Sequence, residues 1–263
     1  MIRNVAIAAE RTFAPTVRCS GTNGSSVTTN GSSVATNGSG LENDSSIGFK
    51  ENYESLLKLV SRLNASHVGL SKDSIISASP GSKSSLRLSP TATTIHVHEN
   101  SNYSIGVFIL GHNKKIPLHD HPNMFGMIKC IHGKLSIKSY TPLPSTGTKY
   151  TVPSRVLSRI PKEMFPTLTP CKFSEEKVVV STEETVCSLD PANGNIHEIT
   201  AIDGPAAFID ILSPPYDGHE RDCTYYTLLD GGGKENDIAW LMPTQPPKDY
   251  WTQPAEYCGP PII

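Results

Sequence analysis

Long apolar runs and an excess of charge of either sign are both missing from this chain of 263 residues. No stretch approaches the roughly 18 apolar residues that a membrane span needs, and the N-terminus has no continuous apolar signal core. Lys and Arg number 23 against 25 Asp and Glu, which leaves a formal charge of −2 and no basic field to attract a phosphate backbone. We therefore predict a soluble protein with neither nucleic acid nor membrane as a partner.

Closely spaced cysteine pairs are also missing. The six cysteines lie far apart and form no C-x-x-C pair, so neither a thiolate zinc site nor a compact disulfide framework is indicated. Reduced thiols are typical of a cytosol-like compartment, and we predict a cytoplasmic protein. The alternative is mitochondrial, because Arg3, Arg11 and Arg18 against the single acid Glu10 give the first 20 residues a weak presequence character.

Composition divides the chain into two parts. Residues 1–48 are predicted to be a low-complexity, disordered tail, because Ser, Thr, Asn and Gly dominate residues 19–46 and offer little apolar surface to offset the entropy of ordering. One domain is expected over 49–263. It begins with an amphipathic helix at about 49–64, in which apolar residues recur at helical spacing. These residues are Phe49, Tyr53, Leu56, Leu57, Val60 and Leu63.

The pattern changes beyond about residue 91. Short runs of alternating or β-branched residues follow one another there, separated by turn signals such as His132-Gly133 and Asn193-Gly194. Many short strands joined by tight turns are typical of a β-sandwich or a β-barrel. We predict a mainly β fold with a barrel over about 91–230, followed by an extended, Pro-rich C-terminal wrap over 231–263.

Two histidines one residue apart, His119 and His121 in the run PLHDHP, carry the most information about function. Side chains two apart on a strand share a face, and neutral imidazoles are the commonest protein metal ligands. The best third donor is His197 in GNIHEI, so far downstream that a folded sheet must bring it to the pair. His96 and His98 repeat the spacing without flanking turn glycines, and we interpret them as surface residues.

These motifs resemble those of the cupin superfamily, in which an H-x-H pair between two glycines is followed downstream by a further histidine. Gly111 and Gly133 flank the pair here, and Pro191 and Gly194 precede the third histidine. Many cupins carry a glutamate ligand where this chain reads MFG at 124–126. The resemblance therefore implies a cupin-type barrel, the double-stranded β-helix or jelly roll, whose metal site lacks a carboxylate ligand.

Longer runs resemble the cysteamine dioxygenase and plant cysteine oxidase family of thiol dioxygenases, also called N-terminal cysteine oxidases. They are PLHDHPNMFGMIKCIHGKLSIKSY, GNIHEI and GPAAFIDILSPPYD. The resemblance assigns three ligands of a mononuclear non-haem Fe(II): His119, His121 and His197. It implies roles beside the metal for Asp210 and Tyr216. Some members form a thioether between a cysteine and the tyrosine two residues on, which here are Cys223 and Tyr225.

The residues themselves leave several of these roles open. Asp210 lies in an apolar run, where a carboxylate needs a partner, and that partner could be a ligand histidine, a substrate amine or a loop. Tyr216 follows two prolines and could either reach over the metal or pack beneath a loop. Cys223 and Tyr225 share a strand face, which brings them close without proving a bond.

The activity implied by the resemblance is oxidation of a thiol by O2 to the sulfinic acid. Cysteamine and the N-terminal cysteine of peptides and proteins are the implied substrates, the latter with a role in oxygen sensing, and we expect a monomer. Three neutral imidazoles would leave Fe(II) its full charge and open positions for sulfur and O2. The alternative is a non-catalytic cupin that binds a small ligand or a partner. A third hypothesis, a cupin isomerase with a different metal, is weaker, because the glutamate that often serves as ligand or base is missing.

Overall fold

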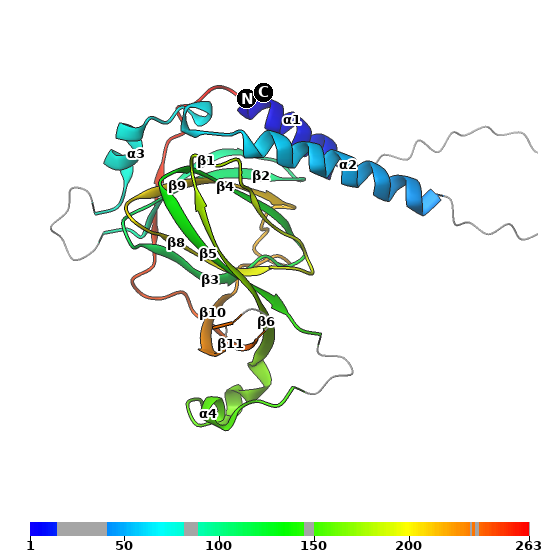
Figure 1. Cartoon of the computed structure of the whole chain (residues 1–263), viewed down its shortest axis with the longest axis vertical. Helices are drawn as coiled ribbons and strands as arrows, with labels where there is room; N and C mark the ends of the chain where they lie inside the picture. The colour runs from blue at the N-terminus through cyan, green and yellow to red at the C-terminus, as the bar shows by residue number, and fades with distance from the viewer. Residues whose placement is uncertain (15–40, 82–88, 145–149, 232, 235–236, 263) are drawn as a thin grey trace, which may run out of the picture.

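A computed structural model describes residues 1–14, 41–81, 89–144, 150–231, 233–234 and 237–262, with the backbone alone for 41–47. Strands are the most abundant regular structure in the described chain, and the helices lie outside the sheets (Figure 1). They are α1 (Ile2–Phe13), α2 (Leu41–Ser61), α3 (Lys72–Ala78), α4 (Ser154–Leu157) and the short 3-10 helices η1 (Ala65–Val68) and η2 (Lys162–Thr167). Among the described residues, no helix combines the length and hydropathy that crossing a membrane requires.

Twelve strands in the described chain form two sheets. One sheet has the order β12 (Thr252–Ala255), β1 (Ala92–Glu99), β2 (Ser104–Leu110), β9 (Ala206–Ser213), β4 (Phe125–His132) and β7 (Cys187–Leu189). The other closes into a barrel with the order β10 (Tyr225–Asp230), β11 (Ile238–Thr244), β6 (Thr169–Val180), β5 (Lys134–Pro142), β8 (Ile196–Ala201) and β3 (Lys115–Asp120). The prediction of a mainly β fold with a barrel is confirmed.

Apolar residues on β2 and β9 contribute to two separate core clusters, because their side chains alternate between the two faces of the sheet. Ile105, Val107 and Ile209 join the buried faces of α1 and α2, which lie across this sheet in Figure 1. Leu110 and Phe208 belong to a second cluster with barrel residues of β3, β5 and β8. The sheet is therefore covered by helices on one side and by the barrel strands on the other.

The prediction of disorder over residues 1–48 is wrong for residues 2–13, which form α1. Ile2, Val5, Ala6 and Ala9 recur at i, i+3, i+4 and i+7 and are all buried against the core that α1 shares with α2. Glu10 ties the helix to the loop after β1 by accepting hydrogen bonds from Asn100 and Asn102 at 2.8 Å each. The helix α2 also begins earlier than predicted, at Leu41. The Ser- and Asn-rich part of the predicted tail, from residue 15 to 40, lies outside the described residues.

The predicted C-terminal wrap is wrong for residues 238–244. These residues form β11, which pairs with β10 and β6 and is needed to close the barrel. The apolar side chains of Ala239 and Leu241 are fully buried, and this burial outweighs the Pro-rich composition that surrounds the strand. Beyond β11 the chain crosses back, and β12 pairs in parallel with β1.

Candidate metal centre

Three histidines from neighbouring parts of the barrel meet at one point. His119 on β3 and His197 on β8 are directly paired in the antiparallel ladder, and His121 lies just beyond the end of β3. One ring nitrogen from each histidine lies within 4.8 Å of those of the other two. His121 Nε2 and His197 Nε2 are 3.1 Å apart. The three residues that the sequence singled out are therefore brought together.

Burial keeps all three imidazoles neutral at physiological pH. The exposed fractions of His119, His121 and His197 are 8%, 1% and 3%. Desolvation lowers the pKa of His119 to about 4, and it lowers the pKa values of His121 and His197 well below the ordinary value. Neutral imidazole is the form that ligates a metal, so the histidines are already in the binding state.

Hydrogen bonds on the far side of two rings fix which nitrogen faces the centre. His119 Nδ1 donates to the carbonyl of Pro117 at 2.8 Å. His121 Nδ1 donates to the Tyr216 hydroxyl at 2.7 Å, and that hydroxyl donates to the carbonyl of Asp120 at 2.6 Å. This network assigns the proton to Nδ1 and leaves Nε2 as a lone-pair donor in both rings. Tyr216 thus contacts the His121 ring from the side away from the centre, which is neither of the two positions considered from the sequence.

The donor set fits a divalent transition metal. Nitrogen lone pairs that face one another at 3.1 Å cannot hydrogen bond when both rings carry their proton on the other nitrogen, whereas a cation between them satisfies both. No carboxylate joins the three imidazoles in the cluster found among the described residues. A metal held there would keep its full positive charge and have positions free for other ligands.

A cavity of about 320 Å³ lies beside the histidines, between the barrel and the sheet of β1, β2 and β9. Its lining includes His119, His121 and every further site residue expected from the sequence: Asp210, Tyr216, Cys223 and Tyr225. His96 lies at its border but is exposed, and His98 packs its ring 5.4 Å from that of Tyr103. Neither belongs to the histidine cluster.

Asp210 presents an unsatisfied acceptor to this cavity. Its Oδ1 atom is buried and has no hydrogen-bond partner among the described residues, and desolvation raises its pKa to about 7. A buried carboxylate oxygen without a partner is costly. Among the described residues neither the three histidines nor a loop bonds to this atom, so it is free to accept a hydrogen bond from a donor in the cavity.

Cys223 and Tyr225 lie together on the wall of the cavity, next to the histidines. Tyr225 is paired with His119 in the ladder, with ring centroids 6.1 Å apart. The Cys223 thiol lies within hydrogen-bonding reach of the hydroxyls of both Tyr216 and Tyr225, and burial raises the pKa of Cys223 to about 11. The thiol is therefore protonated at neutral pH and adjacent to the phenol.

Two residues of the site were missed from the sequence. Asn195 is buried and hydrogen bonds to both backbone groups of His121, although its position in GNIHEI is a signal that could have been used. Tyr250 lines the cavity and is hydrogen bonded to Tyr225, with ring centroids 5.7 Å apart. It comes from the segment before β12, which no motif marks.

A closed barrel whose adjacent strands bring three neutral imidazoles to one buried point defines the class of the protein as a cupin-type barrel with a candidate metal centre. Within that class, the chain belongs to the PCO_ADO family, whose model matches residues 59–262. The family resemblance drawn from the sequence motifs is thereby confirmed.

Named relatives agree with this assignment. The chain is 33% identical to 2-aminoethanethiol dioxygenase of Mus musculus, over 82% of this chain and 87% of that protein. It is 32% identical to the Homo sapiens protein of the same name, over 82% and 83%. Plant cysteine oxidase 1 of Arabidopsis thaliana is 33% identical over 56% of this chain and 45% of the plant protein.

Solved structures are more distant. A cupin superfamily protein from Desulfitobacterium hafniense has a TM-score of 0.30 and 10% identity, covering 47% of this chain and 78% of that one. KdgF from Halomonas sp. has a TM-score of 0.32 and 10% identity, covering 48% and 82%.

Proposed function

We propose that this protein is a metal-dependent thiol dioxygenase that converts an aminothiol to its sulfinic acid with O2. The observation that carries the proposal is the cluster of three buried, neutral imidazoles beside a cavity that contains an unpartnered carboxylate oxygen. The names of the relatives, 2-aminoethanethiol dioxygenase and plant cysteine oxidase, support the reaction class. The reaction is balanced as RSH + O2 → RSO2H, with sulfur oxidised and O2 reduced.

We propose mononuclear, non-haem Fe(II) as the metal, held by His119, His121 and His197. When bound, ferrous iron supplies a Lewis-acidic, redox-active centre for thiolate and O2. The protein holds the imidazoles neutral by burial, and it orients two of them through Pro117 and Tyr216. Because the ligands bring no negative charge, an anionic sulfur is attracted to the site.

The proposed role of Asp210 is to bind the substrate amine. Cysteamine and an N-terminal cysteine share an ammonium group two carbons from the sulfur. A substrate whose sulfur faces the histidines can therefore direct its ammonium into the same cavity, where Oδ1 of Asp210 lacks a partner. A charge-assisted hydrogen bond there would satisfy both groups. The role of Tyr216 is to orient His121 through its hydroxyl.

The thioether between Cys223 and Tyr225 stays a prediction, supported by the closeness of the two side chains. Forming it breaks the S–H bond and one ring C–H bond and releases two electrons and two protons, which O2, the co-substrate of the proposed reaction, takes up to give H2O2. We expect intact-protein mass spectrometry to show a loss of two hydrogens after turnover, and a Cys223→Ser variant to lack this change. An unchanged mass in the turned-over wild type would refute the crosslink.

We further propose a monomeric, cytoplasmic enzyme, with the mitochondrion as the alternative compartment, whose substrates include N-terminal cysteine peptides and proteins as well as cysteamine. An oxygen-sensing role would follow if the rate with such peptides varies over the physiological range of O2. Size-exclusion chromatography tests the monomer, and fractionation of cells that express the tagged chain tests the compartment.

The decisive experiment measures O2 consumption by Fe(II)-loaded protein with cysteamine and with a peptide that begins with cysteine. We expect uptake of O2 and a product that has gained two oxygen atoms by mass spectrometry. The same peptide with an acetylated N-terminus is the control, and it should react at least tenfold more slowly because Asp210 has no ammonium to bind. Bound iron without oxidation of either thiol would favour the non-catalytic cupin instead.

A further inference from the structure

Asn195 connects the two segments that carry His121 and His197. Its side chain is buried, with 6% exposure. Oδ1 accepts a hydrogen bond from the His121 backbone N–H at 3.2 Å, and Nδ2 donates to the His121 carbonyl at 2.7 Å. Nδ2 also donates to the carbonyl of Asp190 at 3.2 Å. One amide thus satisfies both backbone groups of a candidate metal ligand.

The ladder between β3 and β8 explains why a side chain is needed at this point. Backbone pairing is irregular between Ile116 and His119, and the last recorded pair joins Asp120 to Ile196. His121 lies beyond that pair: among the described residues no neighbouring strand pairs with it, and its carbonyl also accepts from the Met124 N–H of the following turn at 3.1 Å. A primary amide presents a donor and an acceptor side by side, as a peptide group does in an antiparallel rung. The Asn195 side chain therefore continues the ladder by one residue.

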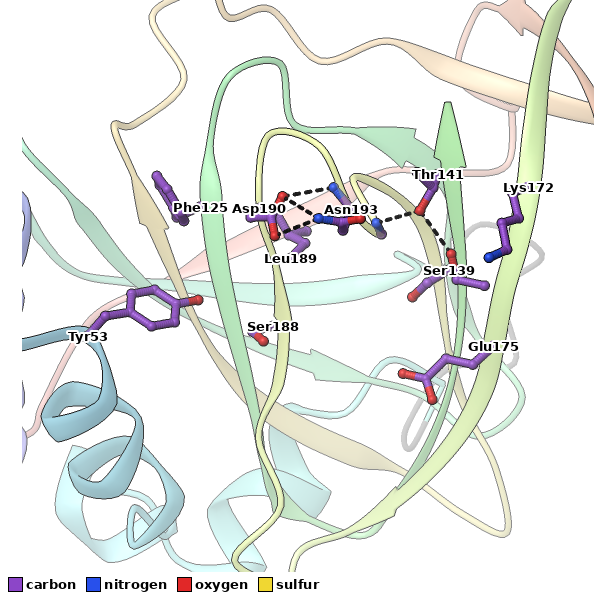
Figure 2. A pocket seen from close by; sticks show the side chains of 12 residues that line it. Tyr53, Phe125, Ser139, Thr141, Lys172, Glu175, Ser188, Leu189, Asp190 and Asn193 are labelled. Atoms are coloured by element: carbon purple, nitrogen blue, oxygen red, sulfur yellow. Dashed lines mark hydrogen bonds between the residues drawn. The ribbon is translucent and has the colours of Figure 1, made fainter. Parts of the chain in front are cut away.

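The turn before Asn195 is stabilised by hydrogen bonds within the turn and to β5. Asp190 Oδ1 accepts from the backbone of Ala192 at 2.7 Å and of Asn193 at 2.8 Å. Gly194 N–H donates to Thr141 Oγ1 on β5 at 2.9 Å. Figure 2 shows Asp190, Asn193 and Thr141 of this network in the wall of a cavity of about 520 Å³, which none of the three histidines lines. The amide is thus supported on the side away from the metal ligands.

We propose that Asn195 is a positioning residue of the metal centre, which locks the His121 backbone to the strand that carries His197 and so sets the separation of their ring nitrogens. The inference rests on the proposed function only in requiring that the three histidines bind a metal. A role confined to folding would lower stability and leave the metal site unchanged once the protein is folded. Metal affinity and the spectrum of the bound ion separate the two roles.

The experiment uses the metal-free full chain and titrates it with Co²⁺ against a chelator of known affinity. Asn195→Asp keeps the shape of the side chain but removes the Nδ2 donor and places a carboxylate against two carbonyls. Asn195→Ala removes both bonds to His121. We expect each variant to bind Co²⁺ about 10- to 100-fold more weakly, as is typical when a group that supports a metal ligand is lost. The visible absorption of the Co²⁺ complex should also change.

The matched control is Asn193→Ala, two residues away in the same turn. Asn193 is exposed, and within the described parts of the chain its side chain bonds to Asp190 alone, so we expect Co²⁺ affinity within twofold of wild type and an unchanged spectrum. Thermal denaturation of the metal-free proteins reports any loss of stability separately. Should Asn195→Asp fail to fold, Asn195→Ser, which replaces the amide with a single shorter hydroxyl, should fold and show an intermediate loss of affinity.

Wild-type affinity and spectrum in folded Asn195→Ala or Asn195→Ser would overturn the inference and leave the proposed function intact. A wild-type protein that binds Co²⁺ and Fe²⁺ but oxidises no thiol would refute the proposed function, while the effect of Asn195 on metal affinity would still stand. A wild-type protein that binds neither ion would overturn both.

Discussion

The hydroxyl of Tyr216 is the recorded hydrogen-bond partner of the His121 imidazole on the side away from the centre. Tyr216→Phe removes this hydroxyl, so the His121 imidazole loses the hydrogen bond that orients it. We expect Fe²⁺ or Co²⁺ to bind about tenfold more weakly. Competition with a chelator measures the change. Tyr226→Phe is the control, because its hydroxyl bonds to the Asp120 carboxylate at 2.9 Å and touches no ligand. Equal losses in the two variants would contradict a specific role for Tyr216.

For Asp210 we predict kinetic effects that depend on the substrate and on pH. Asp210→Asn keeps the size but removes the charge, and should raise KM for cysteamine about 10- to 100-fold, in line with a lost charge-assisted bond of about 1.5 to 3 kcal/mol. A thiol without an amine should be unaffected. Burial raises the pKa of Asp210 to about 7, and only the ionised form attracts an ammonium, so kcat/KM for cysteamine should rise with pH through about 7. A flat profile in the wild type would contradict the assignment.

The sequence predicts those site residues whose chemistry is local and misses those whose role depends on tertiary contacts. His119 and His121 are recognisable because strand periodicity alone places them on one face. The functions of Asn195 and Tyr250 depend on which backbone or ring lies opposite them. The motif GNIHEI places Asn195 near a candidate ligand, but no local pattern identifies the group it bonds to or marks Tyr250, because both partners are fixed only when the strands pair.

The helix α1 is a structural element of the core. Val5 is fully buried, whereas Ile7 on the opposite face is 60% exposed. Val5→Asp would bury an unpaired carboxylate and should lower the free energy of unfolding by about 3 kcal/mol or more. Ile7→Asp should change it by less than about 0.5 kcal/mol, the usual limit for surface positions. Urea denaturation measures both, and a tail that contributes no packing would give two equally stable variants.

Elements with a strong local period are predicted well, and those flanked by biased composition are not. The apolar repeat in α1 covers only about a dozen residues. The Ser- and Asn-rich stretch that follows it dominates the average composition of residues 1–48. The strand β11 contains the apolar run IAWLM, but the prolines on its C-terminal side favour an extended wrap. In both cases burial against a distant partner supplies the stabilisation, and a local window contains no information about that partner.

At the scale of the whole molecule, the two ends of the chain meet on one core. Ile2 at the start of α1 and Ile262 near the C-terminus belong to the same buried cluster, and the two ends lie side by side in Figure 1. Between them, the segment before β12 places Tyr250 against the cavity beside the histidines. The C-terminal segment thus serves both the packing of the helices and the wall of the candidate site.

The three buried histidines should make the stability of the metal-free protein depend steeply on pH. Their pKa values are lowered in the folded state, to about 4 for His119, whereas an unfolded histidine titrates near 6.5. Between these values the unfolded chain binds more protons than the folded one. The free energy of unfolding should therefore fall as pH decreases below 6.5, by up to about 1.4 kcal/mol per pH unit for each histidine. Urea denaturation of the chelator-treated protein between pH 7.5 and 5 measures this slope.

His197→Gln removes one of the three titrating imidazoles and should reduce the slope by up to about 1.4 kcal/mol per pH unit while abolishing tight metal binding. Saturating Fe²⁺ or Co²⁺ should stabilise the wild type at pH 7.5, by about 2.7 kcal/mol when the free ion is at 100 times its dissociation constant. The same ion should stabilise the His197→Gln variant far less. Because protons compete with the metal for the same nitrogens, the stabilisation should shrink as the pH falls. A metal effect of equal size in His197→Gln would place the ion elsewhere and remove the basis for a three-histidine centre.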